Sequence, residues 1–180
     1  ELGRRLSEDL GIAYYDRQII TEIAKRTSLS EEYVHQIIEH KPYMPFPITI
    51  GRSFYPLTDP VVEQTLSVYN EQHNIIREMA EKSDCVIVGR CADYILREKA
   101  DCLKVFIHAD MAFRAERIVK VYGEREQSPE QRLRDKDKRR AAYHRFYTDM
   151  KWGRAQNYHI TLNSGVLGID RCAEIICGLF

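Results

Sequence analysis

Short apolar segments alternate with longer amphipathic stretches along most of this chain, and this alternation limits the folds that the chain can adopt. The strand-like segments occupy residues 12–15, 85–88, 103–107 and 158–162. Residues 85–88 are apolar at every position, which is typical of a strand buried on both faces of a sheet. Strands that alternate with helical stretches predict an α/β fold, a parallel sheet flanked by helices, in a single domain over residues 1–180.

The helical stretches are recognised by apolar residues at three- and four-residue spacing and by the residues that start them. Asp59 before Pro60 and Ser128 before Pro129 each place a capping residue ahead of a proline at the first helical position. We therefore expect helices over residues 2–10, 19–24, 30–38, 60–82, 110–122, 129–146 and 169–179.

Residues 42–60 interrupt this pattern. Five of the six prolines lie there, with four aromatic residues among them. Proline is excluded from helix interiors and central strands, so the segment is expected to be irregular. A lid or flap on the substrate side is the preferred interpretation, and a disordered insert is the alternative.

Charge and composition exclude several classes of protein. Lys and Arg number 27, as do Asp and Glu, which disfavours a general nucleic-acid binder. No apolar run approaches the roughly 20 residues that span a bilayer, so a membrane protein is not expected. Residues 111–154 nevertheless hold 13 basic against 7 acidic residues, whereas residues 1–110 hold 13 against 18. This local basic block indicates an anionic ligand or, alternatively, a solvated helix face.

The cysteines and histidines lack the spacing of metal sites or of common hydrolase motifs. The five cysteines form no C-x-x-C pair, and an odd number of them indicates reduced thiols in a cytoplasmic protein. The six histidines show no H-E-x-x-H pattern, which disfavours a metalloenzyme or a hydrolase.

Polar residues follow each predicted strand, where ligands of parallel α/β sheets bind. These residues are Asp16–Arg17, Gly89–Arg90, His108–Asp110 and Asn163–Gly165. Each has a purely structural alternative: Asp16 is also suited to a turn or a helix cap, and Arg90 to a surface ion pair.

Two groups of arginines complete the candidate site. Arg114 and Arg117 are three residues apart, so they share a helix face on which an anion or an aromatic base could lie. Residues 132–140 are the densest charge block, in which Asp137 and Arg140 also share a face. Guanidinium groups match phosphate oxygens, although solvated helices carry similar runs. The block has few apolar anchors, so we expect this helix to be mobile without a ligand.

Taken in order, these segments resemble the P-loop nucleoside monophosphate kinases, and most of all the cytidylate kinase-like family. The resemblance covers nearly the whole chain except residues 28–60. It rests on residues 2–11 followed by 14–16, on 86–93, on 105–109 with Arg114 and Arg117, on 137–140 with Tyr143, and on 157–170.

The resemblance implies a three-layer P-loop kinase fold with five parallel strands, ATP as the phosphoryl donor, Mg²⁺, and a small-molecule phosphate acceptor, with a cytidylate-type nucleoside monophosphate as the first candidate. Residues 28–82 would form an acceptor-side insertion and a long helix, and residues 124–150 a lid. The implied catalytic residues are Arg90, Asp137 and Arg140, which would contact the acceptor or the transferring phosphate. The implied nucleotide- or phosphate-binding residues are Asp16, Arg17, Arg114, Arg117, Arg134 and Asn163.

The chain departs from the family pattern at three places. Arg17 stands where cytidylate kinases have a serine, and Cys91 where an aspartate usually follows the Gly-Arg pair. The first strand and the glycine-rich phosphate loop would precede residue 1. We therefore expect roughly 10 to 20 further residues upstream, and a slot between residues 12–15 with 85–88 and residues 103–107 with 158–162. A non-catalytic nucleotide-binding module and a kinase for a non-nucleotide metabolite stay open as alternatives.

Overall fold

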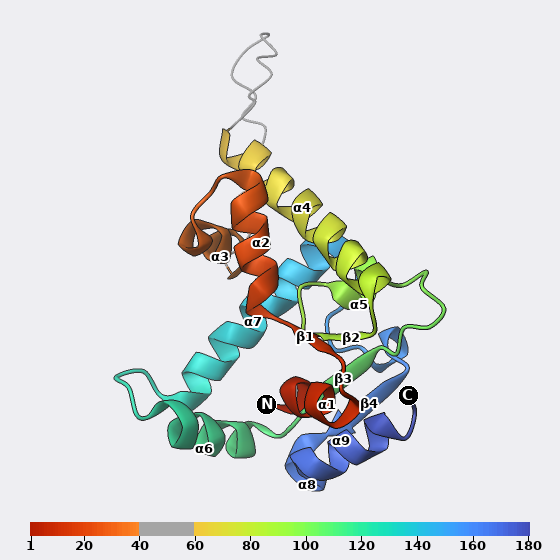
Figure 1. The fold of residues 1–180 in the computed structure, drawn as a ribbon. Coiled ribbons are helices and arrows are strands. Elements are labelled where there is room, and N and C mark those ends of the chain that lie inside the picture. Colours follow the sequence, from red (N-terminus) through yellow and green to blue (C-terminus); the bar gives the residue numbers. More distant parts are fainter. Residues whose placement is uncertain (40–59) are drawn as a thin grey trace.

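The computed structural model describes residues 1–39 and 60–180 (Figure 1). Most of the proline- and aromatic-rich segment lies outside these residues. The elements in chain order are α1 (Leu2–Leu10), β1 (Ala13–Tyr15), α2 (Arg17–Thr27), α3 (Glu31–Glu39), α4 (Pro60–Lys82), β2 (Cys85–Ile87), α5 (Ala92–Ile95), β3 (Val105–His108), α6 (Met111–Tyr122), α7 (Pro129–Thr148), a 3₁₀ turn (Ala155–Asn157), β4 (Ile160–Asn163), α8 (Ser164–Leu167) and α9 (Ile169–Cys177).

The four described strands form two parallel pairs. β1 pairs with β2, with Ala13 opposite Cys85, and β3 pairs with β4, with His108 opposite Asn163. Within the described chain, each pair is a separate two-stranded sheet. The predicted α/β architecture of parallel strands flanked by helices is confirmed, but the described strands form two short sheets rather than one.

Burial of β2 differs from the expectation. The strand was expected to be buried on both faces, but its residues are only half-buried and the following Val88 is 40% exposed. The reason lies in the sheet: among the described strands, β2 has a hydrogen-bonded neighbour on one side alone. Continuous apolar character therefore does not ensure full burial where the sheet is this narrow.

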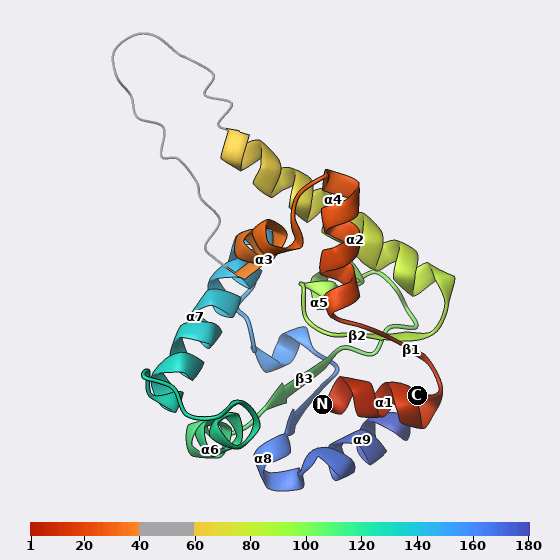
Figure 2. The ribbon, with the colours of Figure 1, turned by 60° about the vertical axis from the view of Figure 1, so that its left-hand side comes forward.

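Helix α1 packs against both strand pairs. Its buried Leu2 and Leu6 join Leu162 of β4 in one apolar cluster, against which Val86 of β2 also packs. A Cβ atom on Gly3 would lie 2.8 Å from a methyl carbon of Val88, so only glycine allows this close approach. Figure 2 shows α1 and α9 side by side below the strands.

A second apolar cluster lies around α2 and α4. Ile19, Ile23, Ile75 and Ile76 are among its fully buried residues, and Tyr143 of α7 also belongs to it.

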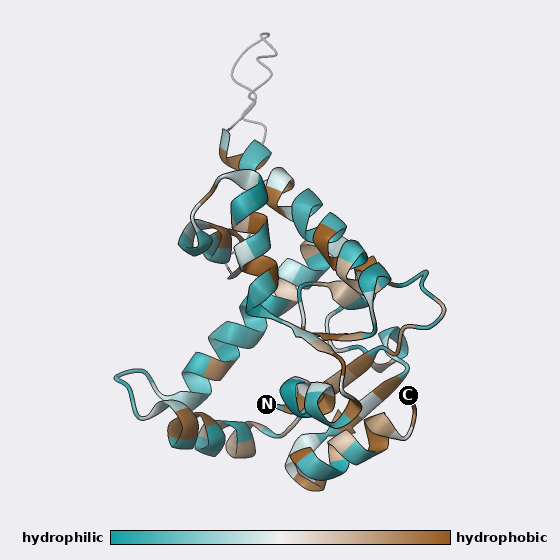
Figure 3. Cartoon of the chain, in the orientation of Figure 1, coloured by the Kyte–Doolittle hydropathy of each residue, from teal (hydrophilic) through white to brown (hydrophobic). Residues whose placement is uncertain are grey.

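The two halves of helix α7 differ in how many of their residues are buried. Tyr143, His144 and Thr148 are buried in the C-terminal half, and Leu133 is buried in the N-terminal half. Figure 3 shows that α7 is largely hydrophilic along its length.

Among the helices described, none is both long enough and apolar enough to cross a membrane.

Candidate active site

Asp16 and Arg90 lie at the same end of the β1–β2 pair. The amide of Val88 donates to the carbonyl of Tyr15 at 3.0 Å, which aligns the ends of the two strands. Asp16 follows β1 directly, and Arg90 comes two residues after Val88. The sequence-based placement of both residues at the carboxyl ends of these strands is therefore correct.

Asp16 faces solvent-accessible space rather than the helix that it precedes. It occupies the N-cap position of α2, yet its side chain makes no capping hydrogen bond. Its Oδ2 accepts a 3.3 Å hydrogen bond from Tyr14 Oη, and burial together with the charge of Asp16 raises the pKa of that phenol. The two residues line an open pocket of about 540 Å³, together with Glu1, Arg4, Arg5, Glu8, Ile169 and Asp170. Arg17 is exposed in the first turn of α2.

The turn that carries Arg90 has an unusual backbone. Gly89, Arg90 and Cys91 follow one another with φ values of 74°, 56° and 55°, in the left-handed region. That region costs a residue with a side chain about 1–2 kcal/mol. The carbonyl of Arg90 accepts a 3.0 Å hydrogen bond from Nε2 of Gln72 on α4. The half-buried Arg90 is thus held in a strained conformation by a contact from another element.

Cys91 points into the protein and does not replace a carboxylate. It is 5% exposed, and burial raises the pKa of its thiol to about 12. The nearby carboxylate of Asp93 contacts α7 instead, because its Oδ2 lies 2.9 Å from His144 Nε2. An anionic side chain is therefore absent at position 91, and the one at position 93 is already paired.

Arg114 and Asp137 form an ion pair between α6 and α7. Nη1 and Nη2 of Arg114 donate to the two carboxylate oxygens of Asp137 at 2.7 and 2.9 Å. This pairing holds the pKa of the guanidinium above its ordinary value. Arg140 is exposed one helical turn further along α7, and Arg134 is exposed as well. The structure thus joins one predicted nucleotide-binding residue to one predicted catalytic residue.

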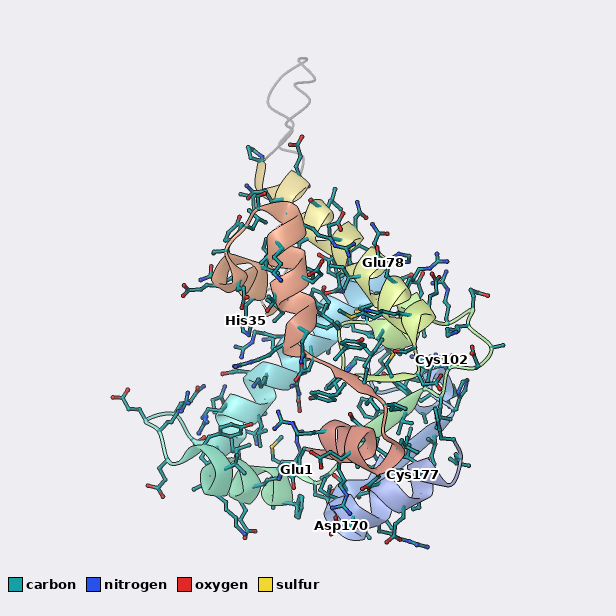
Figure 4. All side chains as sticks on the ribbon, viewed as in Figure 1. Glu1, His35, Glu78, Cys102, Asp170 and Cys177 are labelled. Carbon is teal, nitrogen blue, oxygen red and sulfur yellow. The ribbon has the colours of Figure 1, made fainter. Side chains whose placement is uncertain are left out.

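Arg117 contacts a different carboxylate from its neighbour. Its Nη2 donates to Glu1 at the N-cap position of α1, and Figure 4 shows Glu1 at the end of α1 that faces α6. Arg114 and Arg117 share a helix face as predicted, but in this structure they reach separate acidic partners on α7 and α1. A carboxylate at a helix N-terminus occupies a position that also suits a phosphate.

Asn163 caps a short helix at the end of β4. Its Oδ1 accepts hydrogen bonds from the amides of Gly165 at 3.0 Å and Val166 at 3.3 Å. The hydroxyl of Ser164 donates to the carbonyl of His108 at 3.2 Å, which ties the ends of β3 and β4 together. The carbonyl oxygen of the Asn163 side chain is thus used in the cap.

Gln72 and His144 are not among the residues that the sequence patterns single out. Gln72 interrupts the apolar stripe of α4 between Val68 and Ile75, and a polar residue at such a core position is the signal that could have revealed it. His144 follows Tyr143 on α7, and nothing in its spacing indicates its partner Asp93, 51 residues away.

The residue types fit a phosphate ligand better than a metal held by protein alone. The described residues contain no group of three or more His, Cys, Asp or Glu side chains that could hold a metal ion. Mg²⁺ commonly keeps one or two carboxylates and takes its other oxygens from phosphates and water. Arg114 and Arg117 carry guanidinium groups of the kind that bind phosphate oxygens, and in this structure both are paired with carboxylates.

Comparison with known proteins agrees with this chemistry. The model of the cytidylate kinase-like family matches residues 1–166. A solved structure of an uncharacterized protein from Eubacterium ventriosum ATCC 27560 is 26% identical, with a TM-score of 0.71, and the match covers 99% of this chain and 88% of that one. No curated protein matches the chain. Since the family model covers most of its length, the chain belongs to the cytidylate kinase-like family.

Proposed function

We propose that this protein is an ATP-dependent kinase that transfers a phosphoryl group to a small phosphorylated acceptor, with a cytidylate-type nucleoside monophosphate as the first candidate. The observation that carries the proposal is the placement of Arg90, on a strained turn, at the same strand ends as Asp16. Family membership supports kinase-type chemistry. A cytoplasmic location accords with five free cysteines.

Phosphoryl transfer requires positioning and charge compensation more than covalent catalysis. Arg90 and Arg140 would bind the oxygens of the acceptor or of the transferring phosphate. Asp137 would orient the two arginines. Arg114 and Arg117 would bind phosphates on the ATP side after leaving Asp137 and Glu1, and Arg17 and Arg134 would add further positive charge. Asn163 would lie near the base of ATP. Mg²⁺ would neutralise charge on the β- and γ-phosphate oxygens.

We also propose that the two parallel strand pairs belong to one three-layer P-loop kinase fold. The position of α1, which packs against both pairs, supports this proposal. In this proposal residues 28–82 belong to the acceptor side, and residues 124–150 form the lid.

A non-catalytic nucleotide sensor is the second candidate. It is favoured by Cys91, whose buried thiol cannot act as the carboxylate that the family pattern has at this position. The same substitution, with Arg17, leaves room for an acceptor other than cytidylate.

A coupled assay of ADP release by the full-length protein separates these candidates. The panel contains nucleoside monophosphates and other small phosphorylated or hydroxylated metabolites, and the variants are Arg90→Ala and, as a matched control, the exposed Arg97→Ala. We expect one acceptor to stimulate ADP release, and Arg90→Ala to reduce it about 100-fold or more. ATP binding without stimulation by any acceptor would instead favour the sensor.

A further inference from the structure

Gln72 is a fully buried polar residue with both ends of its side chain bonded. It is 0% exposed and lies on α4 among the buried Val68, Ile75 and Ile76. Its Nε2 donates to the carbonyl of Arg90 at 3.0 Å, and its Oε1 accepts from the hydroxyl of Tyr143 at 3.0 Å. Burial of an amide is unfavourable unless its groups are paired, so these two partners explain why glutamine is tolerated here.

The first partner is the strained turn before α5. Two consecutive residues with side chains, Arg90 and Cys91, hold positive φ values. Such conformations persist only where the surrounding structure determines them. The bond from Gln72 to Arg90 reaches this turn from another helix, whereas the bond from the amide of Ala92 to the carbonyl of Gly89 is local.

The second partner belongs to the helix that carries the other proposed catalytic residues. Tyr143 is 7% exposed, and it lies one turn after Arg140 and two turns after Asp137 on α7. The next residue, His144, contacts Asp93 at 2.9 Å. Two adjacent residues of α7 therefore hold residues 90–93, one directly and one through Gln72.

We infer that Gln72 is a positioning residue, which sets the place of Arg90 relative to Asp137 and Arg140 by joining the 89–91 turn to α7 through Tyr143. Its chemical consequence rests on the proposed function, but the mechanical coupling does not. Loss of either hydrogen bond should release the strained turn while the rest of the fold persists.

Hydrogen exchange on the full-length protein tests the coupling without any assay of activity. Tyr143→Phe removes one hydroxyl, and Gln72→Met is a second variant that keeps the side-chain length and removes both bonds. We expect the amides of Ala92, Tyr94 and Ile95, which bond to carbonyls of the turn, to exchange about tenfold faster in both variants. Amides of the β3–β4 pair serve as the internal reference.

Tyr33→Phe is the matched control. It removes an equivalent bond, 2.8 Å from Tyr33 Oη to Gln64 Oε1, between α3 and α4. It should leave exchange at residues 92–95 unchanged. Unchanged exchange in Tyr143→Phe, or equal acceleration in Tyr33→Phe, would overturn the inference even if the protein is an active kinase.

Kinetics then test the chemical consequence. If Gln72 positions Arg90 in the transition state, Tyr143→Phe should lower kcat about tenfold and leave the KM for ATP unchanged. The same substitution in an Arg90→Ala background should have no further effect, because the coupled residue is already removed. Additive losses would contradict a positioning role. Faster exchange in a protein without kinase activity would refute the proposed function and uphold the coupling.

Discussion

Arg114 on α6 and Asp137 on α7 bind each other through two hydrogen bonds, at 2.7 and 2.9 Å, with about a quarter of each side chain exposed. Under the proposed function, Arg114 would otherwise bind a phosphate, and the unpaired Asp137 would repel that phosphate. Ligand binding is therefore expected to exchange one partner for another rather than fill a ready site.

Exchange of the two charges tests this interpretation. Each single variant, Arg114→Asp or Asp137→Arg, should lose about 1 kcal/mol of unfolding free energy because it places like charges together. The double variant should regain stability in urea denaturation but not ADP release, since the guanidinium would stand on the wrong helix. Recovery of both properties would mean that the pair is purely structural.

Backbone strain at Arg90 predicts that two variants with equal loss of activity differ in stability. Glycine adopts positive φ freely, whereas alanine does not, so Arg90→Gly should be about 1 kcal/mol more stable than Arg90→Ala. Both variants should lose phosphoryl transfer to a similar extent, because both lack the guanidinium. Thermal unfolding and ADP release together check the prediction, and an Arg90→Gly variant less stable than Arg90→Ala would contradict it.

His144 is expected to make the unfolding free energy depend on pH. Burial alone would lower its pKa, but the hydrogen bond and charge of Asp93, helped by the carbonyl of Met150, outweigh burial and raise the pKa. The folded state thus binds the proton more tightly than the unfolded state, in which the imidazole has a pKa of about 6.5. The stabilisation is complete below that pH and is lost as pH rises through the folded-state pKa.

Urea denaturation at a series of pH values from about 5.5 to about 8.5, which covers the ordinary pKa of histidine, measures how the unfolding free energy changes with pH. The stability advantage of the wild type over Asp93→Asn should be largest at the acid end and shrink as pH rises. Tyr158, whose pKa burial and Asp93 raise to about 12, stays neutral over this range. An advantage that does not change with pH would exclude His144 as the titrating group.

The order in which the cysteine thiols are alkylated should follow their exposure to solvent, with the most buried thiols reacting last. Cys91 and Cys172 are buried, and burial raises the pKa of both thiols, to about 12 for Cys91. Iodoacetamide applied to the native protein should therefore modify the partly exposed Cys177 first, and Cys91 and Cys172 only after urea is added. Mass spectrometry of peptides reports the order, and early modification of Cys91 would show that the 89–91 turn opens readily.

Local sequence patterns predicted much of the fold because they act over a few residues. The apolar run at 85–88 and the Ser128–Pro129 start of α7 are of this kind, and Ser128 Oγ does accept from the amide of Gln131 at 3.3 Å. The four-residue helices α5 and α8 were missed, because they are too short to show periodicity.

The candidate site was less predictable because its contacts join distant residues. The strand-end rule correctly grouped Asp16 with Arg90. The pairing of Arg114 with Asp137 depends on how α6 packs on α7, and the burial of Gln72 depends on α2, α4 and α7 meeting in one core. Neither relation follows from spacing along the chain.

Phosphorus NMR of the full-length protein with ATP, Mg²⁺ and the acceptor found in the ADP-release screen observes the proposed phosphoryl transfer itself. We expect the γ-phosphate signal of ATP to decline while a new phosphoanhydride or phosphoester signal of the acceptor grows to equal intensity. Arg90→Ala should abolish both changes, and Arg97→Ala should not. ATP that stays intact with every acceptor, or that yields only inorganic phosphate at the same rate in Arg90→Ala, would contradict the proposed transfer.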